Sequence, residues 1–157
     1  MCLTGCLVDV AQTLQKFSKN DNHQSIVSSI TKGEIYTSAI LEPLNHDPEN
    51  PTTTAVFDGD KVIINGSKYL SEISSLAKGI LISASSNKGV ILVLVKTDNV
   101  KLTQLTSTAN SPLFKVELNN VSIEQSDIVH QEGRGLETLR YLLQINMVMR
   151  SYIALGV

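Results

Sequence analysis

Hydrophobic residues recur at helical spacing over the first 32 positions. Between residues 3 and 17 they lie three or four apart, which places them on one face of a helix, with Asp9 and other polar residues opposite. After a polar break, a second and shorter apolar pattern ends at Gly33, a residue suited to terminating a helix. Residues 1–32 are therefore expected to form a helical hairpin, which is too small to hold a core alone.

From residue 34 the spacing changes to that of extended chain. Short β-branched runs alternate with turn residues; Asp58-Gly59 predicts a hairpin, and Asn119-Asn120 predicts another turn. The run 89–95 is almost wholly apolar, so we expect it to be buried on both faces. This density of short strands favours a β-barrel or sandwich. The expected strands are 35–41, 52–57, 61–65, 79–84, 90–96, 101–105 and 113–118.

Helical spacing returns after Gly133-Arg134-Gly135 and continues to Val157. Apolar residues cover nearly the whole circumference of this last helix, which is typical of a helix that neighbours bury. The glycines are expected to shape the start of the helix, because Gly-Arg-Gly falls far short of a nucleotide-binding motif. Either the chain is a piece of a larger protein, or other subunits of an oligomer cover the helix.

Composition narrows the class of protein. The chain has 157 residues, of which 42% are hydrophobic, enough for one domain with a core. Its 13 Lys and Arg against 15 Asp and Glu give a net charge of -2 without a basic stretch, which argues against a nucleic-acid partner. No apolar run approaches the ~20 residues of a membrane span, and the first residues do not resemble a signal peptide. We expect a soluble, cytoplasmic protein.

The residues that could ligate a metal are few. Cys2 and Cys6 lie four apart in a helical pattern, so reduced and partly buried thiols are expected rather than a disulfide framework. The histidines, His23, His46 and His130, are scattered without ligand spacing. No metal site is predicted.

A series of short motifs follows a familiar order along the chain, and Asn-Gly-x-Lys after an Asp-Gly hairpin is the most specific of them. The series resembles the central part of the acyl-CoA dehydrogenase family, flavoenzymes that introduce a double bond α,β to a thioester. The resemblance implies an α+β fold: a helical N-terminal arm (1–32), a β-barrel middle domain (33–131) and the start of a C-terminal helical bundle (132–157). The motifs are Gly33-Glu34, Glu42-Pro43, Thr54-Ala55, Asp58-Gly59-Asp60, Ile64-Asn65-Gly66-Ser67-Lys68, Val116-Glu117-Leu118-Asn119-Asn120-Val121, Gly133-Arg134-Gly135 and Arg150 with Ala154 and Gly156.

The resemblance also implies a cofactor and a substrate. In the family the middle barrel carries the flavin ring of FAD, and helices complete the acyl-CoA thioester site. The family's Thr-Glu-Pro-x-x-Gly-Ser-Asp pattern has Leu41 here at its Thr and His46 at its Ser, while Leu70-Ser71-Glu72 stands for its Trp-Ile-Thr. The implied flavin-facing residues are Ser38, Ile40, Leu41, His46, Leu70, Ser71 and Glu72, and Arg150 is implied to lie beside the thioester.

These departures change the chemistry of the implied site. A leucine packs on a ring but cannot donate a hydrogen bond, and an unpaired buried polar edge costs about 1 to 3 kcal/mol. An ionised Glu72 only accepts hydrogen bonds and would repel a reduced flavin. The family's general base is a Glu in the C-terminal bundle or, in some members, just before the Arg, where this chain has Met149. No catalytic residue is therefore nominated.

Two hypotheses remain open from the sequence. The chain is an acyl-CoA dehydrogenase-like protein, inactive alone, that acts with other chains; or it is a non-catalytic structural or assembly subunit that binds neither flavin nor thioester. Alternatives also remain at single positions. Glu42-Pro43 is a vestige of the flavin strand or a simple strand end, and Arg150 serves the thioester or a helix-to-helix ion pair. Glu72 is interpreted as a solvated carboxylate at a strand end.

Overall fold

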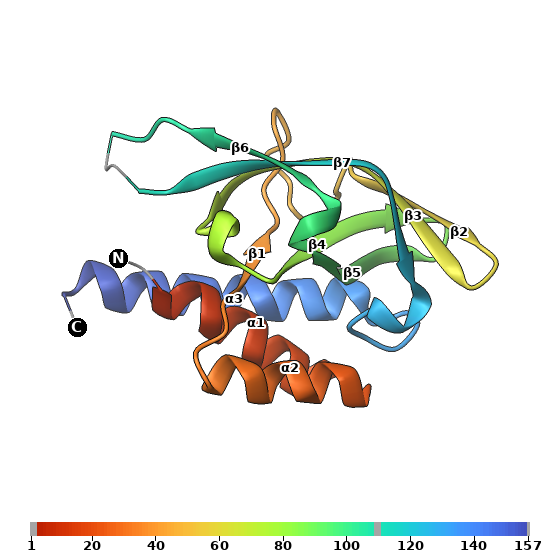
Figure 1. Cartoon of the computed structure of the whole chain (residues 1–157), viewed down its shortest axis with the longest axis horizontal. Helices are drawn as coiled ribbons and strands as arrows, with labels where there is room; N and C mark the ends of the chain where they lie inside the picture. The colour runs from red at the N-terminus through yellow and green to blue at the C-terminus, as the bar shows by residue number, and fades with distance from the viewer. Residues whose placement is uncertain (1–2, 109–110, 157) are drawn as a thin grey trace.

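Three helices pack on one side of a curled sheet (Figure 1). The computed structural model describes residues 3–108 and 111–156, with the side chains of the first helix described from residue 8 onward. Helices α1 (Leu3–Phe17) and α2 (Asp21–Thr31) precede the sheet, and α3 (Gly135–Ala154) follows it. The hairpin of helices predicted for residues 1–32 is thus confirmed over the described residues.

The sheet of the described chain has seven strands in the order β1-β4-β2-β3-β7-β6, with β5 paired to β4. The pairs β2–β3, β3–β7, β4–β5 and β6–β7 are antiparallel, whereas β4 runs parallel to both β1 and β2. This curled half-barrel flanked by helices confirms the expected α+β class. The strands are β1 (Tyr36–Ala39), β2 (Thr54–Asp58), β3 (Lys61–Glu72), β4 (Gly79–Ser86), β5 (Gly89–Lys96), β6 (Lys101–Leu105) and β7 (Leu113–Glu124).

Alternating side chains of β4 and β5 separate two apolar cores. Ile91 and Val93 of β5 face a core within the curl of the sheet, whereas Leu92 packs in a second core toward the helices. There it meets Leu14 of α1 and Leu139 of α3. Burial of β5 on both faces confirms the expectation drawn from its apolar run, and it shows why the helices and the sheet form one unit.

One polar residue of α1 is not where the sequence placed it. Asp9 was predicted on the solvent face, but its side chain is fully buried. Helix α3 packs along α1 and covers that side, and the period of α1 alone cannot reveal a second neighbour. Gln12, Gln15 and Lys16 are exposed as predicted.

Strands β3 and β7 continue well past their predicted ends through irregular pairing with each other. Asn119-Asn120 is not a turn, and β7 continues through it. Asn120 takes a left-handed φ of 50°, and its N–H donates to Asn65 Oδ1 at 2.8 Å, where the β3–β7 register shifts. A second shift follows Lys68, where Leu70 has φ 57°, so β3 runs to Glu72 rather than ending at residue 65. Strand β1 is shorter than the predicted 35–41.

Helix α3 is buried over its first half and exposed over its second. Leu139 and Leu142 are buried in the core, whereas Met147 and Tyr152 are 69% and 54% exposed. The expectation that further helices or subunits cover this part of α3 stays a prediction. Within the described residues, no helix has both the length and the apolar character needed to cross a membrane.

The start of α3 has no room for a side chain at Gly135. A Cβ at this position would lie 1.7 Å from the carbonyl oxygen of Val90 in β5. We expect Gly135→Ala to lower the free energy of unfolding by about 3 kcal/mol or more, because backbone must move to relieve the overlap. Urea denaturation followed by circular dichroism measures the loss. Gln144→Ala, on the exposed face of the same helix, is expected to change stability by less than about 0.5 kcal/mol. Equal stability of the two variants would contradict the close approach.

Candidate functional site

A cleft of about 280 Å³ lies between the ends of β1 and β3 and one face of α3. It gathers residues from segments 38–41, 69–72 and 142–150, which are far apart in the sequence. Six of the eight residues that the resemblance implied line it: Ser38, Ile40, Leu41, Leu70, Glu72 and Arg150. Their roles stay predictions. Tyr69, Leu113, Leu142, Leu143 and Asn146 are among the other lining residues.

Three hydrogen bonds fasten the two strand ends that form one wall of the cleft. The N–H of Tyr69 donates to the carbonyl of Leu41 at 2.7 Å. The hydroxyl of Thr37 donates to the carbonyl of Glu72 at 2.9 Å. The hydroxyl of Ser71 donates to the carbonyl of Ser38 at 3.3 Å. The wall is therefore set by the relative position of β1 and β3.

Two of the implied residues do not line the cleft. His46 lies exposed in the loop between β1 and β2. Ser71 is buried, and besides donating to Ser38 its hydroxyl accepts a hydrogen bond from Ser74 at 2.7 Å. The register shift after Lys68 turns Ser71 inward and leaves Leu70 42% exposed, a consequence that linear motif matching cannot foresee.

Arg150 forms the polar end of the cleft together with Asn146 and Glu72. Its Nε donates to Asn146 Oδ1 at 2.7 Å, and its Nη2 donates to a Glu72 carboxylate oxygen at 3.0 Å. Glu72 lies at the end of β3 as interpreted, but its side chain is only 19% exposed because it pairs with α3, so it is less solvated than expected. Of the two alternatives for Arg150, a place in the cleft and a helix-to-helix ion pair, the structure shows the first and a variant of the second. Arg150 lines the cleft, and its ion-pair partner Glu72 lies on a strand.

Asp9 lies behind this polar end. Its Oδ2 accepts a hydrogen bond from the side-chain N–H of Asn146, while its Oδ1 is buried and has no partner among the described residues. Burial raises the pKa of Asp9 to about 6, against the opposing effects of the Asn146 hydrogen bond and the Arg150 charge. The sequence interpretation missed both Asp9 and Asn146. Asn146 could have been found as a polar residue between the apolar residues Ile145 and Met147 of the last helix.

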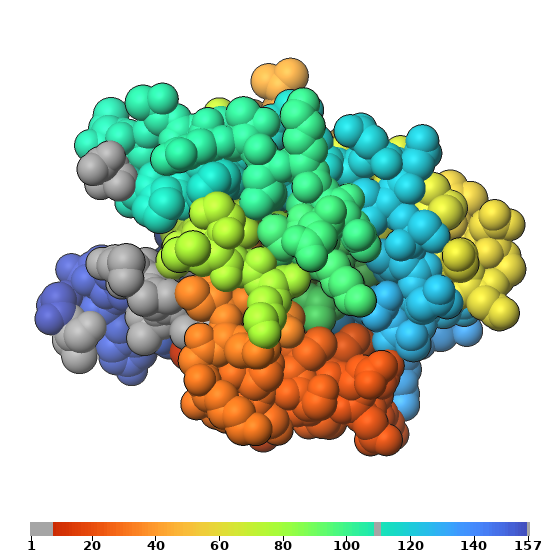
Figure 2. Space-filling model, viewed as in Figure 1, coloured from red at the N-terminus to blue at the C-terminus, as the bar shows by residue number. Residues whose placement is uncertain are grey.

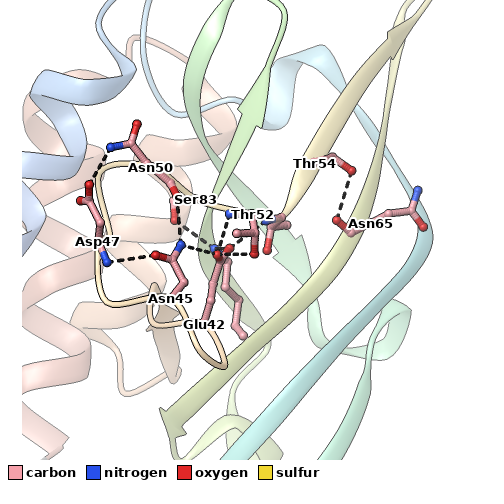
Figure 3. Close-up of polar contacts among 10 residues, drawn as sticks. Glu42, Asn45, Asp47, Asn50, Thr52, Thr54, Asn65 and Ser83 are labelled. Atoms are coloured by element: carbon pink, nitrogen blue, oxygen red, sulfur yellow. Dashed lines mark hydrogen bonds and ion pairs between the residues drawn. The ribbon is translucent and has the colours of Figure 1, made fainter.

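A second polar cluster lies beside the cleft and is centred on the Glu42 carboxylate (Figure 3). Its cation is Lys68. The Nζ of Lys68 is 2.7 Å from Glu42 Oε1 and donates to Ser83 Oγ at 3.1 Å. Lys68 is completely buried and Glu42 is 7% exposed. The Glu-Pro and Asn-Gly-x-Lys motifs of the sequence thus meet in one ion pair, which neither alternative for Glu42-Pro43 anticipated.

The Glu42 carboxylate also closes the loop that follows it. Oε2 accepts hydrogen bonds from the N–H and the hydroxyl of Thr52, at 2.6 and 2.7 Å, and from Asn45. Oε1 accepts a further bond from the Thr53 N–H at 2.9 Å. Burial alone would raise the pKa of Glu42, but these bonds and Lys68 outweigh it and hold the pKa well below its usual range. Burial lowers the pKa of Lys68 to about 8 despite the partner carboxylate.

A larger hollow of about 630 Å³ lies between α2 and the sheet and opens near the centre of Figure 2. Its lining mixes the cations Lys78 and Lys96 with the anions Asp98, Glu124 and Asp127. None of the implied site residues lines it. Among the described residues, no group of three or more His, Cys, Asp or Glu could hold a metal ion. Cys2 and the side chain of Cys6 lie outside the described residues.

No protein-family model matches the sequence, and a comparison with curated proteins gives no match. Solved structures do match. A glutaryl-CoA dehydrogenase from Mycobacterium smegmatis is 20% identical with a TM-score of 0.89, covering 98% of this chain and 42% of its own. Such an enzyme in complex with FADH2 is 19% identical with a TM-score of 0.85, covering 94% of this chain and 40% of its own.

A third match is the ChsE4-ChsE5 complex from Mycobacterium tuberculosis, 20% identical with a TM-score of 0.80, covering 91% of this chain and 38% of the matched chain. The chain has an acyl-CoA dehydrogenase fold. It spans about two fifths of the length of these structures. The region it spans includes the half-barrel and the helices that precede and follow it.

The buried ion pair of this acyl-CoA dehydrogenase fold gives a test by mutation. We expect Lys68→Met to lower the free energy of unfolding by about 3 to 5 kcal/mol, because it leaves the Glu42 charge buried without its cation. The double variant with Glu42→Gln is expected to recover part of the loss. Arg140→Gln, which removes an exposed pair with Glu49, should cost less than about 1 kcal/mol. A Lys68→Met variant as stable as Arg140→Gln would refute a structural role for the pair.

The raised pKa of Asp9 predicts a pH dependence of stability. A carboxyl whose pKa rises on folding contributes stability that is complete below the unfolded pKa of 3.8 and lost as pH rises through about 6. The free energy of unfolding should therefore fall by about 2 to 3 kcal/mol across this window in the wild type relative to Asp9→Asn. Urea denaturation at several pH values measures the difference. Asp98→Asn, at an exposed position, should keep the wild-type profile.

Proposed function

We propose that the chain is an acyl-CoA dehydrogenase-like oxidoreductase unit, inactive by itself, that forms one wall of a site for FAD and an acyl-CoA thioester. Further helices, from the same protein or from other chains, complete this site. The observation that carries the proposal is the cleft, in which strand ends 38–41 and 69–72 face Arg150 of α3 within an acyl-CoA dehydrogenase fold. One of the similar structures is a complex with FADH2, and another comes from a complex of two proteins.

The residues present fit the apolar face of a flavin ring better than its polar edge. Leu41 and Leu70 are 48% and 42% exposed at the cleft, and Tyr69 lines the same wall, so all three could pack against a planar ring. Neither leucine can donate to the ring edge, and the hydroxyl of Ser71 is directed to Ser38. When bound, a flavin would accept the hydride equivalent removed from the substrate.

This chain's own residues would bind and orient, and they would not remove the α-proton. Met149 stands at the position that carries the base in some members of the family, and a thioether cannot take up a proton at neutral pH. Arg150, with 58% of its side chain exposed, would supply a positive charge beside the thioester. The general base would come from the part of the site that completes the cleft.

A second candidate function is a structural or assembly subunit that binds neither flavin nor thioester. It is favoured by the pairing of Glu72 with Arg150, which places a carboxylate where the family has a hydroxyl. An ionised carboxylate there would repel a reduced flavin.

Restoring one family hydrogen bond distinguishes the two functions. We expect FAD to bind the purified chain weakly, and Leu41→Thr to tighten binding about fivefold, because a hydroxyl contributes about 1 kcal/mol to a ring-edge hydrogen bond. Quenching of flavin fluorescence and the visible spectrum measure binding, with and without an acyl-CoA. Leu44→Thr makes the same change at a residue that is 98% exposed outside the cleft, and it should leave binding unchanged. Absence of flavin binding by both the wild type and Leu41→Thr would favour the structural subunit.

A further inference from the structure

A chain of hydrogen bonds connects a buried carboxyl group to the polar end of the cleft. It runs from Asp9 in α1 through Asn146 to Arg150 in α3 and ends at Glu72 of β3. Three of these four residues line the cleft, and Asp9 lies behind them with no exposed surface. Its Oδ1 has no hydrogen-bond partner among the described residues, which is costly for an ionised carboxylate.

The Asn146 side chain fixes the direction of this chain of bonds. Its amide NH₂ donates to Asp9 Oδ2, and its carbonyl oxygen accepts from Arg150 Nε. An ionised Asp9 only accepts hydrogen bonds, so it selects the orientation of the amide that presents oxygen to the guanidinium. The bonds to Asn146 and Glu72 use two of the five N–H groups of Arg150, and over half of that side chain is exposed.

Charge at this end of the cleft depends on whether Asp9 holds a proton. With both carboxylates ionised, Asp9 and Glu72 flank one guanidinium, and the three groups together carry a charge of -1. A proton on Asp9 makes the group neutral. Arg150 and Glu72 are the charged groups that act on Asp9 among the described residues. In the core against α1, α2 contributes Ile30, β1 contributes Tyr36, and Ile40 follows β1. Ionisation of Asp9 thus opposes an anion at Arg150.

The cleft beside Arg150 is lined by apolar side chains on several sides. Ile40 and Leu41 of the first strand end, Leu113 of β7, and Leu142 and Leu143 of α3 contribute to it. A ligand that fits this lining has an apolar chain and one anionic end, and the guanidinium is the cation within the cleft that complements that end.

We propose that the cleft binds the anionic end of an amphiphilic ligand at Arg150 and that Asp9 takes up a proton when it does so. Asp9 is then a positioning residue. In its ionised form it holds Arg150 toward Glu72 through Asn146. In its protonated form it no longer competes for the guanidinium, whose positive charge can then pair with the anionic ligand. By linkage, the anion and the proton each favour binding of the other. Because no flavin is involved, this inference stands or fails independently of FAD binding.

Binding of hexanesulfonate tests the proposal, since a sulfonate stays ionised throughout the range in which Asp9 titrates. We expect the wild-type chain to bind it about tenfold more tightly near pH 5 than near pH 8, a ratio usual for coupled sites. Isothermal titration calorimetry measures the affinity, and repetition in buffers of different ionisation enthalpy measures proton uptake. Neutral hexanol should bind equally at both pH values. None of the histidines lines the cleft.

Three variants separate the roles of the charges. Asp9→Asn keeps an acceptor for Asn146 but has no titrating charge, so it should bind the sulfonate tightly at both pH values and without proton uptake. Glu72→Gln should bind more tightly at both values while keeping the ratio between them. Arg150→Gln should lose the binding. A wild-type affinity that does not change with pH, or a pH dependence that survives in Asp9→Asn, overturns the proposal. If Asp9→Asn does not fold, absence of proton uptake by Glu72→Gln has the same consequence.

Discussion

The geometry of the cleft depends on the buried ion pair between Glu42 and Lys68. Glu42 follows Leu41, and Lys68 precedes Tyr69, so the two charged residues adjoin the backbone hydrogen bond that joins the strand ends. A buried pair adds little net stability, because desolvation offsets most of its attraction, yet neither partner tolerates a shifted register. Moving one strand end by a single residue would leave a charge buried alone. The pair therefore specifies the alignment of 38–41 with 69–72, and that alignment forms the wall.

Two buried carboxylates in this chain differ in what surrounds them. Glu42 accepts hydrogen bonds from a lysine, two backbone N–H groups and two side chains, and its pKa is held low. Asp9 accepts one from a side chain, and burial dominates its pKa. The number of hydrogen-bond donors around a buried carboxylate thus decides whether its pKa falls or rises. A carboxylate with a full set of donors stays ionised and fixes structure. One that lacks donors can take up a proton near neutral pH and respond to its surroundings.

Much of the fold could be predicted from the sequence because its determinants are local. Helical period defined α1 and α3, Asp58-Gly59 defined the β2–β3 hairpin, and an apolar run marked β5 as buried on both faces. Six of the residues that the family resemblance implied line one cleft, and their roles stay predictions. What could not be predicted arises between segments distant in sequence. The register shifts at Asn65 and Leu70 depend on β7, and burial of Asp9 depends on α3, 137 residues away at Asn146. No local pattern encodes such neighbours.

The position of the cleft on α3 connects ligand binding to assembly. Leu142, at the core, and Asn146 and Arg150, one and two turns on, line the cleft, so it lies where the helix passes from its buried to its exposed half. Met147 and Val148 begin the exposed apolar surface within the same two turns, and Tyr152 continues it. Any helix or subunit that covered this surface would lie next to Arg150 and would exclude water from its guanidinium. Loss of water strengthens every charge interaction of the Asp9–Asn146–Arg150–Glu72 chain. The protonation of Asp9 and the covering of α3 would therefore act on the same guanidinium.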